Sequence, residues 1–325
     1  LTIQNNSLLF KNGSISNPDT AAEKGGAIFN TGILTVLDST IENNFALLEG
    51  GAIWNGSQDF EAVTVKRSRL KLNQVFWNPF DDTDVRTARG GAYYSNGGDT
   101  LFEFSEVELN FAVSDTGGGQ GGAIYVASAS PGSEAVVEVF DTTVARNAAE
   151  GSDVFDSPGQ GGGLYAGSDG VLVIGNSTIS LNGRLQASLD QTALSARTDA
   201  GGGIFIEQGG ILELERSTVT LNMIGDLRGG GIRARGEVFL LNGNIIAGNG
   251  RAAARDDLDL TGGGFTVFSP QFNVIGVSAN HDITDGVDGN QVGTPVAFLD
   301  PKLGPLEYNG GFGKTHAPLS GSPAV

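Results

Sequence analysis

The sequence contains no cysteine, two histidines and few basic residues, and these shortages exclude several classes of protein. Without cysteine the chain has neither a disulfide framework nor a thiolate metal site. Lysine and arginine total 19 against 37 acidic residues, and the net charge is −18. Nucleic acids and anionic membrane surfaces both bind clustered basic residues, so neither is expected as a partner. No run of about 18 apolar residues is present, so we expect no membrane insertion by this segment.

Proline is also scarce, whereas glycine is abundant. The 325 residues include 10 prolines and 51 glycines, and the glycines follow no three-residue period, which excludes collagen. Because 39% of the residues are apolar, the chain is able to bury a large core. The glycines are therefore expected to serve local backbone geometry.

Two short patterns alternate along the chain. The first is a pair of glycines, a small residue and an aliphatic or aromatic residue, and it begins at Gly25, Gly50, Gly90, Gly121, Gly161, Gly201 and Gly229. The second is Ser, Thr or Asn, any residue, an aliphatic residue, two residues and Asn, and it ends at Asn12, Asn44, Asn73, Asn110, Asn147, Asn182, Asn222 and Asn249. Self-similarity of this kind is typical of repeat proteins.

The segments between the two patterns predict the fold. Stretches such as "ILTVLDSTI" and "ILELERSTV" alternate aliphatic and polar residues without proline, which is typical of β-strands. Repeats of this kind bury their apolar face by stacking, with parallel strands about 4.8 Å apart. The sequence therefore predicts an all-β protein, a right-handed single-stranded parallel β-helix of about eight to nine coils with a C-terminal cap.

Stacking gives both patterns a structural role. The asparagines are expected to form an amide ladder in which each side chain bonds to its equivalent in the next coil. Its members are Asn44, Asn73, Asn110, Asn147, Asn182, Asn222 and Asn249. At the other corner, glycine permits positive φ and a close approach of two backbones.

The two alternating patterns resemble the repeats of chlamydial polymorphic outer-membrane proteins and related bacterial β-helix proteins. The tail segments "NVIG", "DPKLGPLEYNGG" and "THAPLSGSPAV" resemble the closing part of large secreted bacterial β-helix proteins. The resemblance implies a secreted or surface-displayed bacterial protein, and hence an extracellular or cell-surface location. It implies adhesion as a frequent role, without identifying a ligand.

The chain is expected to divide into β-helix coils at residues 1–277 and a capping segment at residues 278–325. Six of the ten prolines lie at or beyond residue 270, where they interrupt ladder hydrogen bonds and favour a cap. The opening segment "LTIQNNSLLFKN" enters directly in a strand. An uncovered first coil is an exposed sheet edge, so we expect either further residues or a head-to-tail partner there.

Loops on a rigid scaffold commonly carry function, and three of them combine aromatic and acidic residues. Stacking is expected to bring these loops within roughly 10 Å of one another, as a ridge suited to a sugar, a calcium ion or a protein partner. The alternative is that the aromatics cover the coil edge and the acids solvate the loops. The ridge consists of Trp77, Phe80, Asp81, Asp82, Asp84, Asp115, Asp153 and Asp156.

Calcium is the one cofactor that the sequence suggests. The segment "NHDITDGVDGN" places Asp282, Asp285 and Asp288 at spacings that allow oxygen ligands to converge, although an ordinary acidic turn is the favoured explanation. It matches neither the EF-hand loop nor the nonapeptide calcium repeat.

These features favour a non-enzymatic structural or adhesive β-helix. It is expected either to present the loop ridge for adhesion or to build an extracellular filament or matrix by end-to-end assembly. Its expected partners are a polysaccharide, a cell-surface protein or a second copy of the chain. The alternative is a polysaccharide lyase or glycoside hydrolase that uses loop carboxylates, because parallel β-helices include such enzymes. The motifs of those enzymes are missing from the sequence, and both histidines, His281 and His316, lie in the predicted cap.

Overall fold

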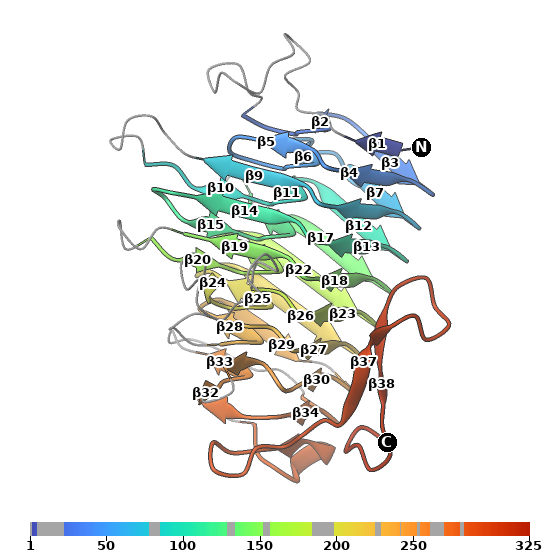
Figure 1. Ribbon diagram of the computed structural model, residues 1–325, viewed down its shortest axis with the longest axis vertical. Helices are drawn as coiled ribbons and strands as arrows, with labels where there is room; N and C mark the ends of the chain where they lie inside the picture. The colour runs from blue at the N-terminus through green and yellow to red at the C-terminus, as the bar shows by residue number, and fades with distance from the viewer. Residues whose placement is uncertain are drawn as a thin grey trace.

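The computed structural model describes residues 2–4, 23–77, 85–128, 134–151, 157–183, 198–224, 229–240, 242–251, 254–260, 270–279 and 283–325. Within these ranges the protein is all-β, and its one helical segment is the short 3-10 helix η3 (Val287–Gly289). The strands form a stack of parallel sheets consistent with a β-solenoid (Figure 1). In the described ranges, no helix has the length and apolar content that crossing a membrane requires.

Three long parallel sheets run along the molecule, and we name them sheets A, D and E. Sheet A contains, in spatial order, β1 (Thr2–Gln4), β4 (Thr40–Glu42), β8 (Arg69–Lys71), β13 (Glu106–Glu108), β18 (Thr143–Ala145), β23 (Thr178–Ser180), β27 (Thr218–Thr220), β30 (Ile245–Ile246), β34 (Val274–Ile275) and β36 (Gln291–Val292). Sheet D contains β2 (Ile28–Asn30), β6 (Ile53–Asn55), β11 (Tyr93–Ser95), β16 (Ile124–Val126), β21 (Leu164–Ala166), β25 (Ile204–Ile206), β28 (Ile232–Ala234), β33 (Leu258–Leu260) and β35 (Ser278–Ala279). Sheet E contains β3 (Leu34–Leu37), β7 (Val63–Lys66), β12 (Asp99–Glu103), β17 (Ala135–Phe140), β22 (Gly170–Gly175), β26 (Ile211–Glu215) and β29 (Glu237–Leu240).

The described residues also form two shorter parallel sheets and two antiparallel strand pairs. Sheet B contains β5 (Phe45–Ala46), β9 (Gln74–Trp77), β14 (Phe111–Ser114) and β19 (Ala148–Glu150). Sheet C contains β10 (Ala88–Arg89), β15 (Gly119–Gln120), β20 (Gly159–Gln160) and β24 (Thr198–Ala200). The antiparallel pairs are β31 (Gly250–Arg251) with β32 (Ala254–Arg255), and β37 (Leu303–Glu307) with β38 (Thr315–Pro318).

The chain visits the five parallel sheets in a regular order. From β11 it passes through sheets D, E, A, B and C, and the following strand, β16, pairs in parallel with β11. Equivalent residues of successive repeats therefore lie side by side, as Tyr93, Ile124 and Leu164 do. Their inward side chains, with those of sheets E and A, form one apolar core in which Phe102 and Val107 are fully buried. This parallel stacking is the arrangement that the sequence predicts.

The ladder asparagines are joined by hydrogen bonds inside the stack. From Asn44 to Asn222, each side-chain amide donates to the Oδ1 atom of the next asparagine at 2.9–3.0 Å. The backbone N–H of each donates to the same oxygen at 2.9–3.2 Å. The ladder ends on a carboxylate, because Asn249 donates to Asp257 at 2.8 Å. A second ladder begins with the backbone N–H of Ser39, which donates to Ser68 Oγ at 3.1 Å.

The glycine corners have the geometry that the sequence predicts. The first glycine of each pair has φ between 59° and 74°, a region that side chains disfavour. A Cβ atom on the second glycine would meet backbone; on Gly51 it would lie 2.1 Å from the carbonyl oxygen of Gly91. The close contact between repeats therefore requires glycine at both positions.

After most strands of sheet E, one residue that is not glycine adopts the left-handed backbone conformation, which the sequence did not reveal. These residues have φ between 46° and 50°, and they are Asp38, Arg67, Phe104, Asp141, Asn176 and Arg216. This repeated conformation stacks these side chains in a column along the edge of sheet E.

Six aromatic rings stack on the outer side of sheet D, on the face opposite the core. Neighbouring ring centroids are 4.3–6.3 Å apart, and the column runs through Phe29, Trp54, Tyr94, Tyr125, Tyr165 and Phe205. From Trp54 to Phe205 the rings are buried. Arg89 lies over the ring of Tyr125, and Trp54 donates to Glu49 at 2.9 Å. This second apolar cluster holds sheet D against the segments that flank it.

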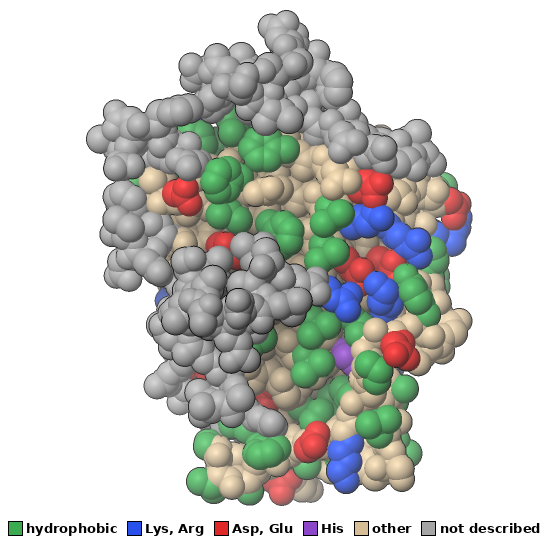
Figure 2. All heavy atoms as spheres, in the orientation of Figure 1, with side chains coloured by type: hydrophobic (Ala, Val, Ile, Leu, Met, Phe, Trp, Pro, Cys, Tyr) green, Lys and Arg blue, Asp and Glu red, His purple; other side chains and the backbone are tan. Residues whose placement is uncertain are grey.

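The C-terminal hairpin β37–β38 lies along the outer side of sheet A (Figure 1). Lys314 Nζ lies 2.7 Å from Glu108, and Thr143 donates to the carbonyl oxygen of Lys314 at 2.8 Å. Charged side chains gather on this side of the molecule, near the one histidine in view (Figure 2). The hairpin therefore braces several repeats from outside. Meanwhile β35 and β36 continue sheets D and A beyond residue 277, and the division at that residue stays a prediction.

Candidate functional site

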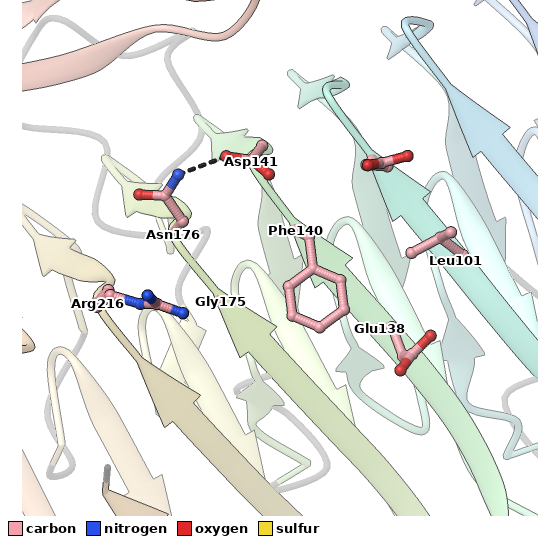
Figure 3. A pocket seen from close by; sticks show the side chains of 8 residues that line it. Leu101, Glu138, Phe140, Asp141, Gly175, Asn176 and Arg216 are labelled. Atoms are coloured by element: carbon pink, nitrogen blue, oxygen red, sulfur yellow. Dashed lines mark hydrogen bonds between the residues drawn. The ribbon is translucent and has the colours of Figure 1, made fainter. Parts of the chain in front are cut away.

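A shallow groove of about 500 Å³ lies on the outer face of sheet E, across strands β12, β17 and β22 (Figure 3). Parallel register brings its lining together from repeats 35–40 residues apart in the chain. The groove is lined by Leu101, Glu103, Glu138, Phe140, Asp141, Gly175, Asn176 and Arg216. Side chains alternate between the two faces of a strand, so residues two apart point to the same face. This alternation explains why every second residue of these strands lines the groove.

The floor of the groove depends on one missing side chain. In register, Glu103, Phe140, Gly175 and Glu215 succeed one another along the outer face. A Cβ atom on Gly175 would lie 2.7 Å from Cδ1 and Cε1 of the Phe140 ring. The ring therefore lies over the glycine, and Figure 3 shows the ring nearly face-on. Glycine at this position both makes room for the ring and hollows the surface.

Glu138 lies beside the ring, two residues earlier on the same strand. Its register partners on the neighbouring strands are Leu101 and Val173, so aliphatic side chains flank the carboxylate. Desolvation by burial, with a smaller contribution from the charge of Asp99, raises the pKa of Glu138 above its ordinary value. This carboxyl group therefore takes up a proton more readily than an ordinary surface glutamate.

The remaining polar groups of the groove are engaged with one another or with neighbours. Lys66 forms an ion pair with Glu103, and Asn176 donates a hydrogen bond to Asp141 (Figure 3). Arg216 lies 3.2 Å from Glu215. The groove thus combines an open aromatic face with one carboxylate, Glu138, that has no partner within the described ranges, and it has polar groups at its rim. This arrangement is suited to a polar ligand that has one apolar face.

The predicted loop ridge is only partly covered by the described residues. Trp77 and Asp115 lie together, because the backbone N–H of Asp115 donates to the carbonyl oxygen of Trp77 at 3.0 Å. Arg86 lies over the indole ring, with its Cζ atom 4.8 Å from the ring centroid, and the Asp115 side chain is exposed. The other predicted ridge residues fall outside the described ranges: Phe80, Asp81, Asp82, Asp84, Asp153 and Asp156.

A buried acid lies beside this region. Glu150, at the end of β19, is 4% exposed, and its Oε1 atom has no hydrogen-bond partner in the described part of the chain. Desolvation raises the pKa of Glu150 to about 8. A carboxyl group in this state is protonated at neutral pH and is not an ordinary metal ligand.

The predicted calcium segment is represented by two of its three acids. Asp285 and Asp288 are exposed, and Oδ1 of Asp285 accepts the backbone N–H of Val292 at 2.9 Å. Asp282 lies outside the described residues. Within the described part of the chain, no group of three or more His, Asp or Glu side chains is placed to hold a metal ion.

Sequence reasoning missed the groove because it looked for chemistry in the variable loops. Glu138, Phe140 and Asp141 lie on or directly after a regular strand, in the segment "AVVEVFD". One signal was present: the segment "VLVIGN" has glycine, Gly175, where the segment "AVVEVFD" has phenylalanine. Gly175 indicates a groove only when the residue beside it in the neighbouring repeat is known to be Phe140.

Comparisons with protein-family models, with curated proteins and with solved structures gave no match. The class of the protein therefore follows from its structure: it is an all-β protein of stacked parallel sheets, consistent with a parallel β-solenoid.

Proposed function

We propose that this protein is a non-enzymatic, secreted or surface-displayed adhesive β-helix that binds a glycan through the groove on sheet E. The observation that carries the proposal is the Phe140 ring, which lies over Gly175 with one face open in a hollow of about 500 Å³. A sugar ring has one face of C–H groups and a polar edge. Such a ligand suits an apolar platform with a few polar groups around it.

The shape of the site also supports a polymeric ligand. The groove is open and runs across three strands rather than closing into a cavity. Asn176 and Arg216 lie at one side and Glu138 at the other (Figure 3). A chain of sugars laid across the sheet would meet a polar group on either side of the platform.

The proposed architecture is a right-handed single-stranded parallel β-helix of about eight to nine coils with a C-terminal cap. The proposed location is the outside of a bacterial cell, in keeping with the resemblance to chlamydial polymorphic outer-membrane repeats. We propose end-to-end association into a filament as a further property, testable by electron microscopy of the purified chain.

A polysaccharide-degrading enzyme is the alternative function, and one observation favours it. Glu138 has a raised pKa and shares the groove with Asp141, and glycoside hydrolysis uses a pair of carboxyl groups in which one is protonated. Release of reducing ends from a bound glycan, abolished by Glu138→Gln with binding retained, would establish the enzyme.

The test of the proposed function is a glycan-binding screen with matched variants. Phe140→Ala removes the platform, and Gly175→Ala displaces the ring without removing any other group of the groove. Phe60→Ala is the control, since Phe60 is a 78% exposed phenylalanine outside the groove. We expect binding to weaken at least about tenfold in the first two variants and to be unchanged in the third. Absence of any glycan ligand, or equal binding by Phe140→Ala and wild type, refutes the proposal.

A further inference from the structure

The carboxylate of Glu138 has no partner among the described residues. No hydrogen bond or ion pair reaches it, and its flanking register neighbours are Leu101 and Val173. The nearest charge that affects it is Asp99, which has the same sign. A partly buried carboxylate with no counter-charge lowers the affinity for a neutral ligand that covers it, because the ligand removes water without replacing the lost hydrogen bonds.

The basic side chains beside the groove do not supply that counter-charge. Each is already paired with another carboxylate: Lys66 with Glu103, Arg67 with Asp38 and Arg216 with Glu215. The Glu138 end of the groove is thus left with an uncompensated negative charge. A ligand that carries a positive charge would provide the missing partner.

The spacing between the platform and the carboxylate sets the size of that ligand. Glu138 and Phe140 point to the same face from positions two apart on β17, about 7 Å along the strand. The amino nitrogen of a hexosamine lies about 3 Å from the ring centre and its hydrogen bond to a carboxylate adds about 3 Å, so the two together span most of this separation. One sugar unit is therefore able to stack on the ring and place a substituent at the carboxylate.

We propose that the glycan recognised by the groove is built from amino sugars with free, protonated amino groups, a de-N-acetylated hexosamine polymer. The C–H face of one unit stacks on Phe140, and its ammonium group donates hydrogen bonds to Glu138. The inference rests on the proposed glycan-binding function and specifies the ligand class of the same groove. An N-acetylated unit lacks the charge and places an acetyl group against the carboxylate, so it is discriminated against.

The test compares two oligosaccharides of equal length by isothermal titration calorimetry. The probes are the hexamers of glucosamine and of N-acetylglucosamine, titrated into the full chain below neutral pH, where the amine is protonated. We expect the glucosamine hexamer to bind about 10- to 100-fold more tightly, as a hydrogen bond between charged partners implies. Glu138→Gln is expected to reduce this preference to less than about threefold.

Glu213→Gln is the matched control for charge. Glu213 lies on the same outer face, in register with Val173 and two repeats beyond Glu138 in the same column, but it does not line the groove. Both variants remove one negative charge, so an equal loss of preference in the two would show diffuse electrostatic attraction and overturn the proposal.

Other outcomes separate this inference from the proposed function. Equal binding of both hexamers, with both lost in Phe140→Ala, overturns the amino-sugar inference and leaves glycan binding intact. Failure of any glycan to bind overturns both. Hexalysine binding as tightly as the glucosamine hexamer, and through Glu138, would assign the groove to basic peptides and overturn the inference.

Discussion

Replacement of Asn147 by alanine tests whether the amide ladder stabilises the fold. Asn147 is fully buried in the middle of the ladder. Its Oδ1 atom accepts the backbone N–H and the side-chain amide of Asn110, both at 2.9 Å. Its own amide donates to the carbonyl oxygen of Val107 and to Oδ1 of Asn182, both at 2.9 Å. Truncation removes all four hydrogen bonds.

The loss of stability in Asn147→Ala follows from the groups that lose their hydrogen-bond partner. The backbone N–H of Asn110 loses its partner in a buried site, which costs about 1–3 kcal/mol, and each further lost bond costs about 1 kcal/mol. We therefore expect the free energy of unfolding to fall by about 4–6 kcal/mol in Asn147→Ala. Urea denaturation followed by circular dichroism measures this difference.

Asn309→Ala serves as the matched control, because Asn309 is exposed and its hydrogen bonds lie at the surface. We expect this variant to lie within about 0.5 kcal/mol of wild type. If Asn147→Ala were no less stable than Asn309→Ala, the ladder would be a consequence of stacking that adds no stability, and the reasoning would be refuted.

Three further predictions concern pH dependence and packing. Because burial raises the pKa of Glu150 to about 8, its protonated form stabilises the fold at low pH, and this contribution is lost as pH rises from about 4.5 to 8. In the wild type, the free energy of unfolding should fall by about 5 kcal/mol over this pH range, and in Glu150→Gln this fall should be absent. The same dependence of unfolding free energy on pH in both proteins would contradict the prediction. Burial lowers the pKa of His316, whose ring forms a hydrogen bond with the Ser180 hydroxyl at 2.9 Å. The hairpin β37–β38 should therefore loosen as the pH falls below about 6.5, because protonation of His316 is unfavourable in the folded state. Hydrogen exchange of the hairpin amides should become faster in this range, and the neutral His316→Asn variant should not show the change. Tyr125→Ala opens the aromatic column between two stacked rings and should cost about 3–5 kcal/mol in urea denaturation, whereas Phe60→Ala, at an exposed ring, should cost almost nothing.

The regular part of the fold could be predicted from the sequence, because each of its requirements is local and repeated. Gly51 has room for no side chain, and the same glycine recurs wherever two backbones meet in this way. Asn147 recurs in register for the same reason, since an amide both donates and accepts and therefore pairs with its own copy. The loop ridge was a weaker inference, because loop composition does not determine where a loop lies; of its residues, Trp77 and Asp115 are described and lie together.

The end of the ladder was less predictable. Asp257 takes the place of an asparagine there, where the backbone N–H of Val277 donates to its second oxygen at 2.7 Å. Burial raises the pKa of Asp257 to about 6, against the lowering effect of these hydrogen bonds. A carboxylate accepts but does not donate when ionised, so it suits a position where the chain of donors stops. Asp257 belongs to the segment "RDDLDL" at residues 255–260, which contains three aspartates, and the sequence does not show which of them would occupy that position.

By itself the sequence determined the strands, the glycine corners and the asparagine ladder, since each follows from residue types that recur at the same position of successive repeats. Only the tertiary structure decided where the groove lies. Phe140 and Gly175 are 35 residues apart, and either one alone is an ordinary strand residue. The register of β17 with β22 lays the ring over the glycine, and the register of β12 with β17 leaves Glu138 beside Leu101, with no partner for its carboxylate among the residues that the structure describes. Pairing between repeats depends on insertion lengths that vary from one repeat to the next, so no local pattern contains it.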